Sequence, residues 1–190
     1  MRIWEMLTAD KATLVVPVEN CDHVEKMIVQ GGSLFHLWDV LELHRPRGYK
    51  SKKLTNVVEF AVKADFILSL KGVDAVYDLV NGDAEFLPVR VEGKEYWYMH
   101  VTSVLDCIDY QGSEYRVYSD GRISSFYGLW FREDVIKGHN VFKIKDRPYG
   151  SPYVSEAFKK QLDLLDDAGL RFVLVWDSDL SEPIRMNPFH

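Results

Sequence analysis

Cysteine is scarce in this chain, and no long apolar run is present. The 190 residues include two cysteines, Cys21 and Cys107, each inside an apolar segment. This pattern favours two reduced, buried thiols in a cytosolic protein over a disulfide framework. No window approaches the ~18 apolar residues of a membrane span, and the first residues show no sustained apolar run or small-residue cleavage site. We therefore predict a cytoplasmic protein without membrane contact.

Patterns of catalytic and metal-binding residues are also missing. The six histidines show neither HExxH nor any paired-ligand spacing, and no GxSxG elbow or phosphate-binding Gly-rich loop occurs. His23 lies two residues from Cys21, but the other ligands of a tetrahedral zinc site are lacking. We predict no catalytic residue, no metal and no cofactor. One enzymatic alternative stays open, a small hydrolase or transferase in which His100 works with Asp106 or Asp109.

Positive charge is in the minority and is unevenly spread. The chain has 23 Lys and Arg against 29 Asp and Glu, a formal net charge of −6. This sign is wrong for a nonspecific nucleic-acid binder, so we predict no direct contact with nucleic acid. The segment HRPRGYKSKK, residues 44–53, concentrates basic residues and is predicted to be a solvated loop. An alternative is a phosphate-binding module that uses Lys50, Lys52 and Lys53 of this loop.

Hydrophobic periodicity predicts an α+β protein, because strands come in runs with helices inserted between them. Short strands are expected at MRIWEM and TLVVPV, and a short helix over residues 21–32. Periodicity then weakens up to the basic loop. We predict an N-terminal strand and helix subdomain with the basic loop over residues 1–53 and a main α+β domain over 54–190, together one continuous globular unit.

The main domain is expected to hold a largely antiparallel twisted sheet with a few helices packed on it. Its clearest element is a hairpin over residues 85–104, with a turn at Glu92-Gly93-Lys94 and apolar side chains on both faces of the sheet. Residues 72–82 predict a helix with Tyr77 on its apolar stripe. A C-terminal strand–helix–strand unit follows, in which the helix runs from Ser155 to about Ala168.

The segment FKIKDRPYGSPYVSEAF, residues 142–158, could be an active-site loop or a simple link between a strand and a helix. Ser155 stands where a helix N-cap belongs, and Pro148 interrupts strand pairing. Asp146 is expected to form a side-chain turn with the backbone near Pro148. We predict a structural loop in which only Arg147 has no structural role.

Several aromatic residues are expected to lie on the surface of the protein. The chain has five Trp, ten Tyr and ten Phe, and several lie beside charges, namely Tyr110, Tyr115, Tyr118, Phe126, Tyr127 and Trp130. Tyr and Trp are favoured interface anchors because each buries a large area at little cost in rotamer entropy. Strand alternation predicts that only one of Tyr115 and Tyr118 faces outward.

Four short motifs occur in a specific order: FLPV at 86–89, CID at 107–109, FKIK at 142–145 and VSEAFK at 154–159. With their intervening elements, these motifs resemble an immunity protein family of bacterial polymorphic toxin systems, of the immunity family 11 type. The resemblance covers roughly residues 64–176. It implies a small cytosolic protein, not an enzyme, that binds a cognate toxin protein and blocks its activity.

The resemblance also suggests where the toxin binds. Immunity proteins often present acidic groups to basic nucleases, which would speed association. The expected partner-binding residues are the acidic C-terminal side chains together with two tyrosines: Asp163, Asp166, Asp167, Asp177, Asp179, Tyr115 and Tyr118. Glu182 belongs to the same acidic region. A homodimer is a second association that the sequence leaves open.

Overall fold

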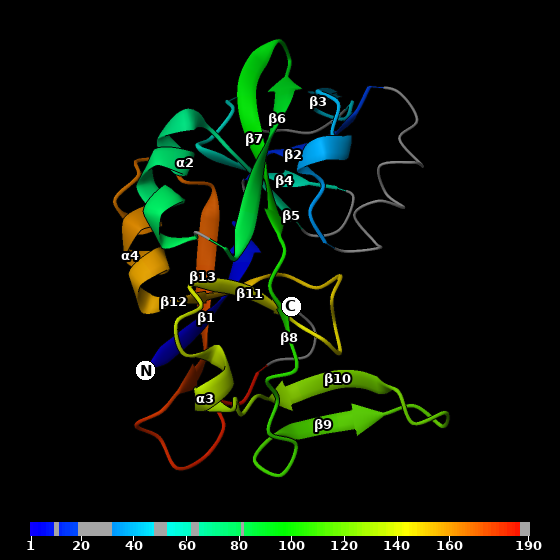
Figure 1. Ribbon diagram of the computed structural model, residues 1–190, viewed down its shortest axis with the longest axis vertical. Coiled ribbons are helices and arrows are strands. Elements are labelled where there is room, and N and C mark those ends of the chain that lie inside the picture. Colours follow the sequence, from blue (N-terminus) through cyan, green and yellow to red (C-terminus); the bar gives the residue numbers. More distant parts are fainter. Residues whose placement is uncertain (10–11, 19–31, 48–52, 62–64, 81, 187–190) are drawn as a thin grey trace.

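The computed structural model describes residues 1–9, 12–18, 32–47, 53–61, 65–80 and 82–186. The helix predicted over 21–32 lies outside the described residues except for Gly32, and so do Cys21, His23, Lys50 and Lys52. Strands dominate and a few short helices pack on them, which agrees with the α+β prediction. In Figure 1 a barrel lies at the top, an open sheet in the middle and a two-stranded ribbon at the bottom.

The barrel is closed, with strand order β2-β3-β6-β7-β5-β4. Its strands, in this order, are Leu14–Pro17, Leu41–His44, Ala84–Val91, Lys94–Val101, Asp65–Leu68 and Val57–Phe60. The β2–β4 and β3–β6 pairs are parallel, and the other pairs are antiparallel. Closure of the barrel therefore depends on pairing between segments far apart in the chain, and the largely antiparallel strands are divided over several sheets.

The hairpin β6–β7 forms as predicted, and both of its faces are covered. Val91 lies opposite Lys94, so the turn consists of Glu92 and Gly93, both with positive φ, 51° and 76°. Such a two-residue turn matches the twist of the flanking strands. One face of the hairpin fills the barrel, and the other packs into a second core between the barrel and the open sheet. The barrel side chains of the hairpin are Leu87, Val89, Val91, Tyr96 and Tyr98.

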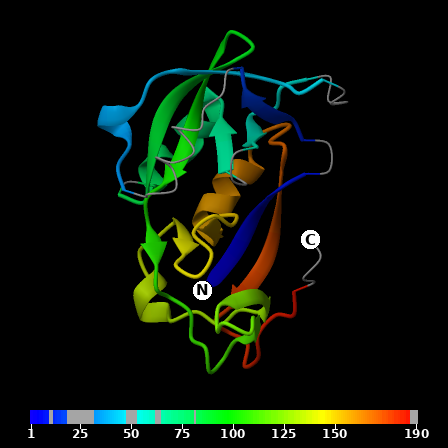
Figure 2. The same ribbon diagram turned by 90° about the vertical axis from the view of Figure 1, so that its right-hand side faces the viewer.

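The open sheet has strand order β13-β1-β12-β11-β8. These strands are Leu170–Asp177, Arg2–Thr8, Tyr153–Ser155, Val141–Ile144 and Val104–Leu105. β1 pairs antiparallel with both β12 and β13, and Figure 2 shows β1 and β13 side by side. Helices α2 (Leu70–Val76) and α4 (Glu156–Asp163) pack against each other and cover the second core.

The two-stranded ribbon is made of β9 (Glu114–Val117) and β10 (Ile123–Gly128), which form a sheet of their own. Phe126 on β10 is buried in a third core with Ile3, Phe142 and Trp176, so the ribbon is anchored to the open sheet through one face. α3 (Glu133–Ile136) follows and packs on the same core through Ile136. Cys107 is also buried there, and burial raises its pKa to about 12.

Two predicted helices differ in detail from the structure. Val73, Val76 and Val80 of the first are buried, but Tyr77 is 62% exposed, because the chain tightens into a 3-10 turn, η2, at Tyr77–Leu79. A second 3-10 turn, η1, spans Phe35–Leu37.

Helix α4 ends at Asp163, five residues before the predicted end. Gly169 lies outside the helix. It has a φ of 79° at the start of β13, where a Cβ would lie 2.6 Å from the carbonyl oxygen of Val57. The ammonium of Lys159 on α4 lies 4.8 Å from the ring centre of Trp4.

Strands from residues 1–53 are distributed over both sheets, since β1 belongs to the open sheet and β2 and β3 to the barrel. The boundary predicted between residues 53 and 54 stays a prediction. Within the described ranges, no helix is long and apolar enough to cross a membrane.

Candidate partner-binding site

The link between β11 and α4 contains the predicted helix cap. The Ser155 hydroxyl accepts a hydrogen bond from the N–H of Phe158 at 3.2 Å, as predicted, and donates to Oδ1 of Asn140 at 2.7 Å. The cap satisfies one of the N–H groups that a helix leaves unpaired at its start. Ser155 therefore has a structural role at the start of α4.

Asp146 and Arg147, which begin this loop, line different hollows. Asp146 does not bond the backbone near Pro148 as predicted; it accepts from the Tyr110 hydroxyl, with 3.1 Å to each carboxylate oxygen. Burial and this carboxylate raise the pKa of Tyr110 to about 12. Arg147 lines a second hollow, which also borders β10. The loop thus joins two concave surfaces that the sequence did not indicate.

The first concave surface, the aromatic hollow, has a volume of about 530 Å³. It is lined by Tyr110, Tyr115, Val117, Tyr118, Arg122 and Asp146, among others. Tyr115 meets Tyr110 edge to face at 5.7 Å and also touches the ring of Phe126. Aromatic side chains around a hollow are suited to hold an apolar group of a partner protein.

Both predicted tyrosine anchors are exposed, Tyr115 by 40% and Tyr118 by 57%. The prediction that only one of them faces outward is wrong, because β9 ends at Val117 and Tyr118 lies in the following turn. Strand alternation no longer applies there. Two other predicted surface aromatics belong to the third core, since Phe126 is buried and Trp130 is partly buried.

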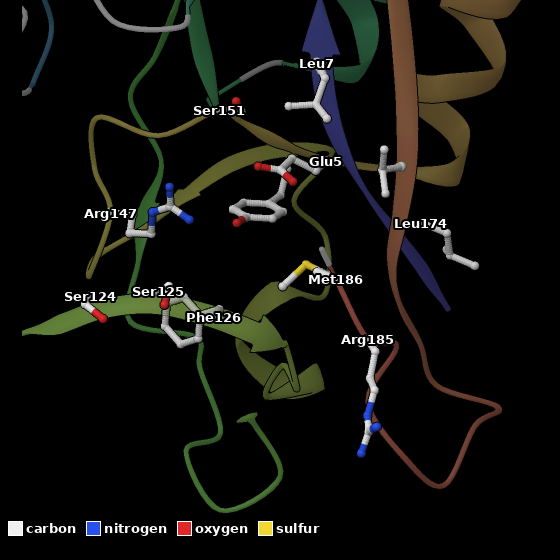
Figure 3. Close-up of a pocket in the computed structure, with 12 residues that line it drawn as sticks. Glu5, Leu7, Ser124, Ser125, Phe126, Arg147, Ser151, Leu174, Arg185 and Met186 are labelled. Atoms are coloured by element: carbon white, nitrogen blue, oxygen red, sulfur yellow. The ribbon is translucent and has the colours of Figure 1, made fainter. Parts of the chain in front are cut away.

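The second concave surface, the polar hollow, has a volume of about 410 Å³ and lies between the open sheet, the ribbon and the last described residues. Figure 3 shows Glu5 and Arg147 reaching into it from different sides, with Ser125 on β10 and Met186 below them. Tyr153 forms part of its lining, and burial strongly raises the pKa of this phenol. The hollow combines charged, hydroxyl and apolar groups, as protein interfaces do.

The five predicted acidic residues fall into two separate groups. Asp163, Asp166 and Asp167 lie before β13, whereas Asp177 and Asp179 lie at its far end. Eight strand residues span about 23 Å, so one small contact area cannot include both groups. Their role in partner binding stays a prediction.

Several of these carboxylates already have cationic partners. Asp163 pairs with Lys159, and Asp167 pairs with Lys53 at 3.0 Å. Asp177 is only 8% exposed and accepts from Arg2 at 2.8 Å, a hydrogen bond that lowers the pKa of Asp177. Of the predicted acidic side chains, those that are exposed and form no ion pair within the described residues are Asp166, Asp179 and Glu182.

The structure does not support the catalytic pair built on His100. Its ring nitrogens lie 2.9 Å from the carbonyl oxygen of Gly32 and 3.4 Å from the hydroxyl of Tyr98. Asp106 instead pairs with Lys145 at 3.1 Å, and Asp109 accepts from a backbone N–H. His100 is a buried, hydrogen-bonded residue of the barrel.

A buried polar network connects the barrel with the open sheet. The Tyr98 hydroxyl donates to Asp65 at 2.7 Å, and the ammonium of Lys143 lies 2.5 Å from the other oxygen of the same carboxylate. Burial raises the pKa of Tyr98 well above its ordinary value. These groups satisfy one another in the interior, so the network is structural.

The phosphate-binding alternative stays a prediction. Arg45 of the basic loop forms a two-pronged contact with Glu92 at 2.8 and 2.7 Å, and Lys53 pairs with Asp167. Lys50 and Lys52 lie outside the described residues. In the part of the chain that the structure describes, no three His, Cys, Asp or Glu side chains are grouped to hold a metal ion.

Two hollows thus border the ribbon, and exposed aromatic side chains line one of them. Residues 85–176 match the model of a family described as Immunity protein family (Imm11). The match spans just under half of the chain, from β6 to β13, and confirms the resemblance for this segment. No curated protein matches the chain.

Proposed function

We propose that the protein is an immunity protein that neutralises a cognate toxin through direct contact, with the aromatic hollow as the contact surface. The proposal rests on the family match over residues 85–176, which includes the whole ribbon. Immunity can be exerted by binding alone, so no catalytic group of the protein is required. The toxin would be the partner, in the cytoplasm, without a role for membrane or nucleic acid.

The aromatic hollow is the favoured contact surface for a physical reason. It gathers Tyr110, Tyr115 and Tyr118 around a concavity, and buried aromatic side chains dominate the energetics of many interfaces. Hydrogen bonding to Asp146 and ring contacts hold Tyr110 and Tyr115 in place. Their conformational entropy is therefore partly lost before any partner arrives.

The test uses the toxin encoded beside this gene, if the genome carries one. Cells that produce this toxin should survive only when the protein is co-expressed. Tyr118→Ala should raise the dissociation rate of the complex roughly tenfold or more. Truncation of a side chain that the partner buries in the complex acts mainly on dissociation. Tyr77→Ala is the matched control, since Tyr77 is similarly exposed but lies by α2.

Two outcomes would contradict the proposal. If the wild-type protein neither binds nor protects against the neighbouring toxin, the immunity function is wrong. If the protein protects but Tyr77→Ala weakens the complex and Tyr118→Ala does not, the contact surface lies near α2 and not on the ribbon.

A further inference from the structure

The outer edge of β9 carries main-chain groups that face away from the molecule. β9 pairs with β10 on one side and lies below it in Figure 1. The N–H of Tyr118 donates to Arg122 at 2.8 Å, and the carbonyl of Arg116 accepts from Ser124 at 3.2 Å, so both residues point toward β10.

Main-chain groups alternate in direction along a strand, and therefore those of Tyr115 and Val117 point outward. β9 pairs with β10 alone, so its other edge has no strand partner among the described residues, and no backbone hydrogen bond outside the β9–β10 pair involves Tyr115 or Val117 there. Both side chains are also exposed. A row of open donors and acceptors is complementary to one kind of partner, an extended chain that adds a strand to the sheet.

We propose that this partner is β9 of a second copy of the protein, paired antiparallel about Tyr115. The two ribbons would then form one four-stranded sheet around a twofold axis. Tyr115 of each copy would exchange both main-chain hydrogen bonds with Tyr115 of the other. This association does not depend on the proposed immunity function.

Charge complementarity favours this partner and this register. With Tyr115 at the centre, Glu114 of each copy lies opposite Arg116 of the other, which gives two cross-strand pairs of opposite charge. A register centred on Arg116 would instead place two guanidinium groups opposite each other. Among the described residues of a single copy, Glu114 forms its ion pair with Arg185 at 3.7 Å, and that arginine is largely exposed.

The pairing has a consequence for the shape of the dimer. A twofold axis that relates antiparallel strands of one sheet is perpendicular to the sheet, so equivalent faces stay on the same side. The two aromatic hollows would therefore open on the same face of the four-stranded sheet. Because each β9 has four residues, the dimer is expected to be weak and to dissociate on dilution.

Sedimentation of the full chain over a range of concentrations tests the proposal. Wild type should pass from monomer to dimer. Glu114→Arg or Arg116→Glu alone should raise the concentration at the midpoint roughly tenfold or more, because each creates two like-charge pairs. The double variant, Glu114→Arg with Arg116→Glu, restores both pairs and should restore the midpoint. Arg90→Glu, a reversal of an exposed strand arginine on the barrel, should leave it unchanged.

Hydrogen exchange on the unmodified protein gives a second measurement that does not depend on how the variants fold. Exchange at the amides of Tyr115 and Val117 should slow as protein concentration rises. A monomer at all concentrations, or a double variant that stays as weak as the singles, would overturn the proposal. So would amides that become protected only when toxin is added, because the edge would then receive a strand of the toxin.

Discussion

At the scale of single residues, Ser155 stabilises the start of α4 with one hydroxyl that both accepts and donates. Ser155→Ala should lower the free energy of unfolding by ~1–2 kcal/mol, because it removes the cap to the N–H of Phe158. It also removes the bond to Asn140. Ser155→Thr keeps the hydroxyl and should lose less. Urea denaturation measures both variants, and toxin protection should be unchanged; a stable Ser155→Ala protein that fails to protect would contradict the structural role.

This cap could be predicted from sequence because its partners are three residues apart. The neighbouring Asp146 could not be predicted in the same way, since its partner Tyr110 lies 36 residues earlier in the chain. Local signals for a side-chain turn were present, but a tertiary contact replaced them. For Arg147, the sequence indicated only that the loop does not need this side chain for its structure. It did not indicate the hollow that Arg147 lines.

At the scale of elements, the pair between Lys143 on β11 and Asp65 on β5 ties the open sheet to the barrel. The two side chains are 6% and 2% exposed. Lys143→Met should lower the free energy of unfolding by about 3–5 kcal/mol, because it leaves a buried carboxylate without its counter-charge. Adding Asp65→Asn removes that charge while keeping an acceptor for Tyr98.

The double variant should therefore be more stable than Lys143→Met alone, although it contains one more substitution. Denaturation of the wild type, both single variants and the double variant in a double-mutant cycle measures this coupling. Strictly additive effects would show that the two residues do not act as a pair, and the link between the sheets would then depend on apolar packing alone.

Elements defined by nearby residues were predicted well, and those defined by distant pairing were not. The β6–β7 hairpin follows from alternating side chains around a Gly-containing turn. Closure of the barrel depends on the parallel pairs β2–β4 and β3–β6, which bring together segments more than 40 residues apart. Helix α4 ends early because the chain must turn so that Gly169 can pass close to Val57. Periodicity within α4 carries no sign of that contact.

At the scale of the whole molecule, the two acidic groups lie at different ends of β13. Their effects on the association rate can therefore be measured separately from contacts in the aromatic hollow. Asp179 and Glu182 lie on the segment that leads to Met186, whose N–H donates to Tyr127 of the ribbon at 2.6 Å. Asp163, Asp166 and Asp167 lie beyond the opposite end of β13. At physiological salt, exposed charges act over only ~8 Å, so the two groups should affect binding at the ribbon differently.

For a basic toxin, Asp179→Asn with Glu182→Gln should slow association at physiological salt. Neutralising Asp163, Asp166 and Asp167 to Asn should slow association mainly at low salt, where the field reaches further. Dissociation should change little in either case, because these side chains lie outside the aromatic hollow.

Stopped-flow association with the toxin over a range of salt concentrations measures both effects. A triple variant that slows association at physiological salt more than the double variant would place the toxin at the α4 end of the molecule. An association rate that does not depend on salt would show that the contact is mainly apolar and that neither acidic group steers it.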